Sequence, residues 1–575
     1  MKLHKENLKK YILTFVFSLL SFMVFAEDSE NEPEADFSES QIILPEVTSS
    51  ADGESMIAGK DAVLDFSNVL PSSEEISSSL PVLPYSPVVQ EEQSSASSQN
   101  EEASQKSVYI EGLLGGGYPG YFTGDFSVYK NSGDSPFLLK FMHESVYGYA
   151  QNLPADGYFD STTVLHGEKK FTAGTFNFKF DADYDTSCYG LQSKSDAFFD
   201  LNTQTISSSD YALWQLPHNF ALKLNFNGEY YTRYGGKILD SVSSLKAQES
   251  KADVLTLNPS FSAMWRNDFL HFDLSSAYNF EGFLSPVEFS EENESPQTAK
   301  IHRGEFDFTG GFVYNNEENF THIDLSVLGG IVIGNEIGET LPVIPRALLN
   351  FVCEGKYGAA SRSFNLNVSG GLDSYLENFS ALEKAFKFTS QSYLPSETSV
   401  WFASIDSSFP IASSFTFDFA GEIKKPLWGN GLWEASYSDA LTSGLYSLYQ
   451  YEDYLFGTQI GISYLWNILN ISLNYKSNWL HVPSNEYPHL VNLNFSYDSD
   501  DGTYGFSLDI AEGLGGLDYI PVINALTYYR LKNSIRLALE VNDAVKLFSG
   551  TNRMWASSAY EQSSGNVTFL IKFFF

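Results

Sequence analysis

The chain has 575 residues and a formal net charge of −38, and 43% of its residues are hydrophobic. This acidity excludes nucleic acid as a favoured partner, because phosphate binding needs clustered Lys and Arg. After residue 26 no apolar run of about 18 residues occurs, which excludes a helical membrane protein. The 47 Phe and 34 Tyr residues instead suit strands that face lipid.

The first 26 residues have the pattern of a secretory signal peptide. Lysines precede an apolar stretch, Tyr11–Phe25, and Val24-Phe25-Ala26 supplies the −3 and −1 positions of a cleavage site. The alternative, an N-terminal membrane anchor, is disfavoured because the apolar run is short for a permanent span. We therefore expect a mature chain that begins at Glu27 and is exported.

Residues 27–106 are rich in Ser, Glu and Pro and carry many more acidic residues than lysines. Such a segment buries too little apolar surface to offset its ordering entropy, so we predict a disordered periplasmic segment. It contains three short apolar patches, at Ile42–Leu44, Val63–Phe66 and Leu80–Tyr85. They are either docking motifs for a periplasmic partner or residual patches in a linker.

From residue 107 to 575 apolar and polar residues alternate in many short runs. Clear examples are Phe176–Tyr184, Leu222–Phe226, Phe364–Val368, Phe415–Ile423, Ile471–Tyr475 and Val491–Tyr497. One face of each run suits lipid and the other carries Asn, Lys, Asp and Glu, which is typical of a membrane barrel. The pattern predicts an all-β, transmembrane antiparallel β-barrel of about 22 strands, with 16 to 20 as the alternative. We expect 207–219 to be a connection, and no helix of useful length after residue 106.

The predicted connections alternate between short and long. Short turn signals occur at 266–268, 315–319, 499–502 and 531–533. Long polar segments occur at about 235–251, 283–299, 376–397, 425–451 and 546–560. Short periplasmic turns and long outer loops are a feature of outer-membrane barrels.

Motifs that carry chemistry are weak. Gly115–Gly120 matches G-x-G-x-x-G, but no helix follows it, so we expect the turn of the first hairpin and no dinucleotide site. The sequence has no G-x-S-x-G, H-E-x-x-H or C-x-x-C motif, and we predict neither an enzyme nor a bound cofactor or metal. Cys188 and Cys353 are either one disulfide or two buried thiols.

The polar faces of the predicted strands supply candidate pore-lining residues. These are Lys179, Asp181, Asp183, Lys223, Asp418, Glu422 and Lys424. An excess of carboxylates in a water-filled lumen favours cations. A passive, cation-preferring channel for small solutes is therefore the first functional hypothesis, although any one of these residues can face water without such a role.

The last strand, Val567–Phe575, is the most specific feature of the chain. Val567, Phe569, Ile571, Phe573 and Phe575 share one apolar face, which would be an aggregation hazard on an open edge. The face is explained if it meets lipid and the strand pairs with the first strand to close a barrel.

With this terminal Phe and these alternate apolar residues, the chain resembles bacterial outer-membrane β-barrels, including those of spirochaetes. The resemblance implies residence in the outer membrane of a diderm bacterium and recognition of the last strand by the barrel assembly machinery. In size the barrel resembles TonB-dependent receptors, which carry a folded N-terminal plug of over a hundred residues. Segment 27–106 is too short and too acidic for such a plug, which argues against coupled uptake.

Two other functions remain open. One is partner-coupled uptake of a specific nutrient. The other is a surface scaffold that binds external ligands, for which loop 425–451, with Trp428 and Trp433, supplies aromatic anchors.

Overall fold

The computed structural model describes the chain from Val108 to Phe574. Inside this range the positions that it does not describe are 131–134, 150–151, 237–238, 240–250, 285–299, 317–320, 335–342, 358–361, 391–396, 413, 430, 441–443, 467, 485, 516–519, 533, 551 and 555–557. The predicted signal peptide, the acidic segment 27–106 and Phe575 therefore lie outside the described residues.

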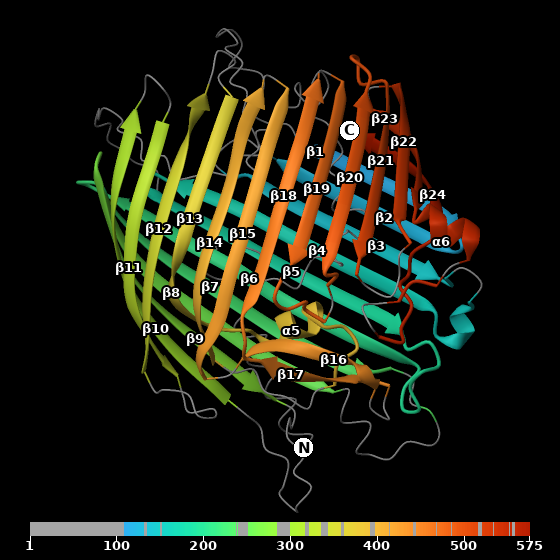
Figure 1. The fold of residues 1–575 in the computed structure, drawn as a ribbon, viewed down its shortest axis with the longest axis horizontal. Coiled ribbons are helices and arrows are strands. Elements are labelled where there is room, and N and C mark those ends of the chain that lie inside the picture. The colour runs from blue at the N-terminus through green and yellow to red at the C-terminus, as the bar shows by residue number, and fades with distance from the viewer. Residues whose placement is uncertain are drawn as a thin grey trace, which may run out of the picture. The chain divides into compact units, whose positions relative to one another are not determined.

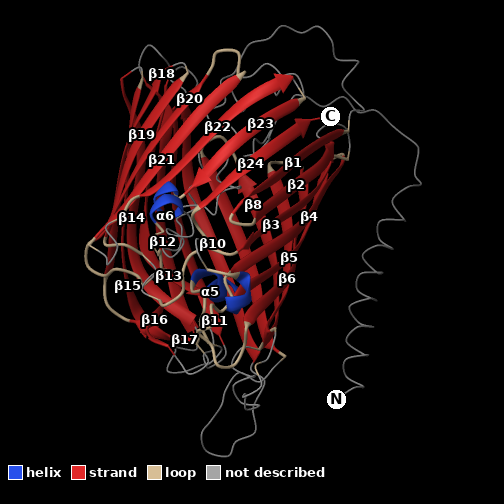
Figure 2. Ribbon diagram, turned by 90° about the vertical axis from the view of Figure 1, so that its right-hand side faces the viewer, coloured by secondary structure: helices blue, strands red, loops and turns tan. Residues whose placement is uncertain are grey.

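The described strands form one closed ring of 22 antiparallel strands (Figures 1 and 2). Its first half runs through β1 (Tyr109–Tyr118), β2 (Tyr121–Lys130), β3 (Phe137–Tyr147), β4 (Phe159–Ala173), β5 (Phe176–Gly190), β6 (Asp200–Leu216), β7 (Phe220–Gly235), β8 (Ala252–Arg266), β9 (Leu270–Phe283), β10 (Lys300–Asn316) and β11 (Thr321–Gly334). The second half runs through β12 (Val343–Tyr357), β13 (Arg362–Leu376), β14 (Glu397–Ala412), β15 (Phe415–Gly429), β18 (Leu455–Trp466), β19 (Leu469–Asn478), β20 (His489–Asp498), β21 (Tyr504–Leu514), β22 (Val522–Lys532), β23 (Ile535–Asn542) and β24 (Asn566–Phe574). The last strand pairs with the first, from Glu111 opposite Phe574 to Tyr118 opposite Val567, so the sheet has no free edge.

The remaining elements lie in connections between strands of the ring. They are the 3-10 helix η2 (Pro154–Asp156), helix α5 (Phe379–Ala385), the hairpin of β16 (Leu432–Ala440) and β17 (Tyr446–Tyr451), and helix α6 (Ala544–Ser549). No helix among the described residues is long and apolar enough to cross a membrane.

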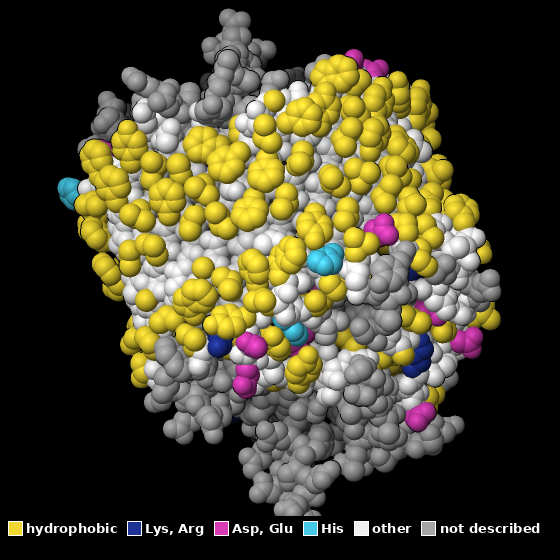
Figure 3. Space-filling view, viewed as in Figure 1, with side chains coloured by type: hydrophobic (Ala, Val, Ile, Leu, Met, Phe, Trp, Pro, Cys, Tyr) yellow, Lys and Arg dark blue, Asp and Glu magenta, His cyan; other side chains and the backbone are white. Residues whose placement is uncertain are grey.

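Side-chain alternation gives the ring an apolar outside. On β24, Phe569 and Ile571 are exposed on the outer face, whereas Thr568 and Leu570, which alternate with them, are buried. Other strands repeat this pattern, and hydrophobic side chains cover the visible wall in Figure 3. An exposed apolar band around a closed sheet suits lipid, because each strand of a closed sheet has hydrogen-bonding neighbours on both sides.

The two ends of the ring differ as the sequence predicts. Tyr109 and Phe574 lie at one end, where the turns between β4 and β5, β6 and β7, and β8 and β9 are short. At the other end lie the long connections with α5, α6 and the β16–β17 hairpin. In Figure 1, α5 and the hairpin lie toward the bottom and α6 at the right-hand side. We call these the short-turn end and the long-loop end.

The structure confirms the predicted 22 strands and corrects three details. Residues 207–216 are not a connection, because β6 continues through them in register with β7. Gly115 to Gly117 lie inside β1, and only Pro119 and Gly120 form the turn to β2. Cys188 and Cys353 are free thiols on β5 and β12, which are not neighbouring strands, so the disulfide alternative is wrong.

Candidate functional site: the lumen and its loop cap

Four connections at the long-loop end meet in one packed structure, which we call the loop cap. They are residues 191–199, 377–396, 430–454 and 543–565, which join β5 to β6, β13 to β14, β15 to β18 and β23 to β24. These strands come from three separate arcs of the ring, β5–β6, β13 to β18 and β23–β24. Connections that start from separate arcs can reach one another only across the end of the barrel.

Buried apolar side chains from all four connections form a single cluster with the ends of the nearby strands. Its members from the loop cap include Leu191, Phe198, Phe379, Leu382, Phe386, Phe388, Tyr437, Tyr446 and Tyr560. The rings of Phe388 and Tyr560 stack with their centroids 3.9 Å apart. The Tyr560 hydroxyl donates to the Gly444 carbonyl, and the Tyr446 hydroxyl accepts from the Ala559 backbone N–H. The loop cap therefore has a hydrophobic core of its own.

Polar contacts fix α5 to the inner wall. Arg233 on β7 is fully buried and donates to Glu383 on α5 and, at 2.9 Å, to the Thr389 carbonyl. Breaking a buried ion pair of this kind by removing one partner typically costs about 3–5 kcal/mol, because the other charge stays buried. Glu281 on β9 accepts a 2.9 Å hydrogen bond from the Phe379 N–H at the start of α5. These contacts hold α5 against β7 and β9, and Figure 2 shows the helix within the outline of the ring.

A second set of charges lines the wall from β10 to β14. It consists of Arg303, Glu305, Asp307, Arg346, Asp373 and Glu397. Arg303 contacts Glu397 at 2.9 Å, and Arg346 contacts Asp373 at 2.8 Å. Two arginines face four carboxylates, so this stretch of the lumen carries an excess of negative charge.

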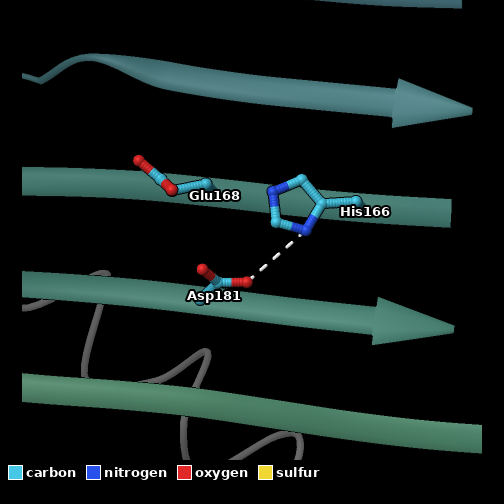
Figure 4. Close-up of side chains that lie close together, drawn as sticks. All are labelled: His166, Glu168 and Asp181. Carbon is cyan, nitrogen blue, oxygen red and sulfur yellow. Dashed lines mark ion pairs between the residues drawn. The ribbon is translucent and has the colours of Figure 1, made fainter. Parts of the chain in front are cut away.

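A third group lies on β4 and β5, where His166, Glu168 and Asp181 point toward one another (Figure 4). Their potential ligand atoms lie within 4.8 Å of each other, which is a spacing that a metal ion can use. However, the Lys179 ammonium sits 2.9 Å from both Glu168 and Asp181, and the Lys170 ammonium lies 3.2 Å from Glu168, so both carboxylates already have cationic partners. His166 Nδ1 lies 2.8 Å from Asp183. We assign the group as an ion-pair network of the inner wall.

The predicted pore-lining residues lie on strands β5, β7 and β15, on the faces that alternate with the apolar outer positions. Lys179, Asp181 and Asp183 belong to the network around His166. The Lys223 ammonium lies 5.3 Å from the centre of the Tyr211 ring. Asp418 is also on β15, where Glu422 pairs with the buried Lys424 at 3.0 Å. The structure thus groups these residues on three strands, and their role in solute passage stays a prediction.

Sequence reasoning missed both the charged residues of the wall from β10 to β14 and the contacts that build the loop cap. Arg303, Glu305 and Asp307 could have been found, since they alternate with Gly304, Phe306 and Phe308 along β10. Arg233 and Glu383 could not have been paired, because they are separated by 150 positions and one of them lies in a loop.

Lys546 in α6 gives the loop cap a testable pH dependence. Its side chain is fully buried, and burial lowers the pKa of the ammonium to about 8, although Glu561 and Asp543 partly offset the shift. Because the unfolded pKa is 10.5, the folded cap carries the full cost of the buried charge below pH 8. That cost, on the order of 3 kcal/mol, is relieved as the pH rises from about 8 toward 10.5.

We therefore expect amide exchange in α6 to show greater local stability at pH 9.5 than at pH 7.5, after correction for the intrinsic exchange rate. In Lys546→Met, which keeps an apolar stem without the charge, the difference should disappear. Equal pH responses in the two proteins would contradict the assignment of the effect to Lys546.

Comparison with known proteins gives a likeness of fold. No protein-family model matches the sequence, and no curated protein matches it. Among solved structures, the FrpB iron transporter from Neisseria meningitidis (F5-1 variant) has a TM-score of 0.60 and 9% identity, over 82% of this chain and 83% of that chain. The copper transporter OprC has a TM-score of 0.58 and 10% identity, over 83% of this chain and 82% of its own.

A third neighbour is the ferric-catecholate import receptor Fiu from K12 E. coli, with a TM-score of 0.53 and 10% identity, over 82% of each chain. These neighbours are transporters and receptors rather than enzymes. The closed ring, its apolar outer band and the likeness to these solved barrels all indicate the same fold. The chain has the fold of an outer-membrane β-barrel, with the 22 strands and overall architecture of TonB-dependent receptors.

Proposed function

We propose that this chain is a gated outer-membrane barrel that imports a specific solute with the help of a periplasmic partner. The observation that carries the proposal is the loop cap, whose connections from separate arcs of the ring share one buried core at the long-loop end. A ring of 22 strands without such a cap would favour passive exchange. The packed cap instead favours entry that depends on loop movement, so coupled uptake replaces the passive channel as the preferred hypothesis.

The solute that fits best is a metal ion or a metal complex. Fold neighbours of this chain transport iron, copper or ferric catecholates. The inner wall from β10 to β14 holds four carboxylates against two arginines, which suits a cationic solute. For coupling, we propose that segment 27–106 binds the periplasmic partner. The first strand begins at Tyr109 at the short-turn end, and in outer-membrane barrels the short turns face the periplasm.

The test is uptake of ferric catecholate and of Cu²⁺ by cells that express or lack the chain. We expect uptake of one of these solutes to depend on the chain, and to stop when an uncoupler dissipates the proton gradient or when residues 27–106, behind the signal peptide, are deleted. Uptake that continues at the same rate with the uncoupler would indicate a passive pore and contradict the coupling. A mutant chain with the same deletion should still reach the outer membrane.

The display scaffold is less well supported. Much of loop 425–451 forms the β16–β17 hairpin, and its Tyr437 and Tyr446 are buried in the loop cap rather than offered to a ligand. Trp433 packs against the same cluster. The Trp428 side chain lies outside the described residues. Outer-membrane lipid and the barrel assembly machinery remain the other partners that we propose.

A further inference from the structure

The inner wall beneath α5 carries two carboxylates in one row. Glu229 on β7 is the register partner of Thr256 on β8, and Thr256 is the register partner of Glu281 on β9. Both carboxylates touch the start of α5. Ser380 donates its hydroxyl to Glu229, and the Phe379 N–H donates to Glu281 Oε1 at 2.9 Å. The row therefore joins the barrel wall to the loop that closes it.

Oxygen atoms without donors gather at this place. Glu281 Oε2 is buried and has no hydrogen-bond partner among the described residues, and the same holds for Oδ1 of Asn258, Asn279 and Asn378. Asn258 lies on β8 two residues after Thr256, which is the register partner of Glu281, and Asn279 lies on β9 two residues before Glu281. Asn378 directly precedes α5. All four unpaired atoms are acceptors. A buried acceptor without a donor is rare in a native protein and calls for an explanation.

The charge of this site is also unbalanced. Glu281 has no exposed surface, and within the described part of the chain no Lys, Arg or His forms an ion pair with it or with Glu229. Arg233, which is near in sequence to Glu229, pairs with Glu383 instead. Water can donate hydrogen bonds to the free oxygens, but it cannot neutralise buried carboxylates. A bound cation does both.

We propose that a hard divalent cation, of which Ca²⁺ is the best match, binds between β7, β8, β9 and the start of α5. The donor set consists of carboxylate and carboxamide oxygens from Glu281, Glu229, Asn258, Asn279 and Asn378. Calcium takes about 6–8 oxygen ligands and tolerates irregular geometry, whereas ions that prefer imidazole or thiolate find no such ligand in this set. Bound there, the cation holds α5 against the wall and keeps the loop cap closed, independently of which solute the barrel imports.

The test is calorimetric titration of the full-length protein in detergent with Ca²⁺, after treatment with a chelator. We expect one saturable site. Glu281→Gln, which keeps the shape of the side chain and removes its charge, should weaken the affinity at least ~10-fold. Glu354→Gln is the matched control, because Glu354 lies on β12 toward the short-turn end, away from the site. The Glu354→Gln protein should bind Ca²⁺ with unchanged affinity.

Two further measurements keep the proposal testable if Glu281→Gln folds poorly. Asn258→Asp adds a carboxylate to the same donor set and should tighten Ca²⁺ binding. Ca²⁺ should also slow proteolysis within residues 377–396 in the unaltered protein. Absence of saturable Ca²⁺ binding at pH 8 would overturn the proposal and indicate that a proton or a bound water satisfies Glu281. Equal Ca²⁺ affinity in the Glu281→Gln and Glu354→Gln proteins would overturn it as well.

Discussion

Replacing residues 377–396 with a short Gly-Ser linker should convert a closed barrel into a conducting one. This connection supplies α5 and much of the buried core of the loop cap, including Phe379, Leu382 and Phe388. It also supplies Glu383, the partner of buried Arg233. Without it the remaining connections lose the surface on which they pack, so the end of the lumen should open. In planar bilayers we expect steady conductance of the variant and rare, brief openings of the unaltered protein.

The matched control is the same linker in place of residues 335–342. This connection joins β11 to β12 at the long-loop end, and no described residue of these two strands belongs to the buried cluster. It should leave the barrel closed. A milder variant, Tyr560→Ala, removes the ring that stacks on Phe388 and should raise the frequency of openings without making them permanent. If the 377–396 variant inserts into the bilayer and remains silent, another segment closes the lumen and the gate is wrongly assigned.

The strands of the barrel wall were predictable because the alternation that specifies each strand lies within one short run of sequence. Alternation with period two assigns each side chain to the lipid or to the lumen face, and a run such as Phe176–Tyr184 shows this without any knowledge of its neighbours. The strand number followed from counting such runs, and the long connections followed from their polar composition. The prediction of a connection over 207–219 was wrong for most of its length, because β6 continues to Leu216 and only 217–219 join it to β7.

The loop cap was not predictable because its contacts are distant in sequence and follow no period. Helix α5 has only seven residues, and its N-terminal contact comes from Glu281, nearly a hundred positions earlier. The stacking of Phe388 on Tyr560 and the pairing of Arg233 with Glu383 likewise depend on the closed ring. The passive channel was inferred from the wall alone, and the cap changes the preferred function because it controls access to the same lumen.

Gly117→Ala should prevent or severely impair closure of the barrel, which is the largest effect on assembly that we expect from a single methyl group. Gly117 lies on β1 opposite Thr568 of β24, at the pairing that closes the ring. A Cβ atom there would lie 2.1 Å from the Val567 carbonyl oxygen and 2.9 Å from the Thr568 Cα. Both are backbone atoms of the closing strand, so no side-chain rotation relieves the clash. Overpacking typically costs about 1–3 kcal/mol, and a clash with backbone belongs at or above the upper end.

The neighbouring glycine supplies the control. A Cβ atom on Gly116 would have the Tyr121 carbonyl oxygen as its nearest neighbour, at 3.9 Å, which is ordinary contact. Gly116→Ala should therefore assemble as the unaltered chain does, although both substitutions remove the same backbone freedom from adjacent positions of one strand. We would compare the two by the heat-modifiable, folded band on gels of outer-membrane fractions and by thermal unfolding of the purified barrels. Equal yields and equal melting temperatures for the two variants would show that β1 and β24 do not pair in this register. Loss of the folded band in Gly117→Ala alone would support the pairing of β1 with β24 that closes the barrel.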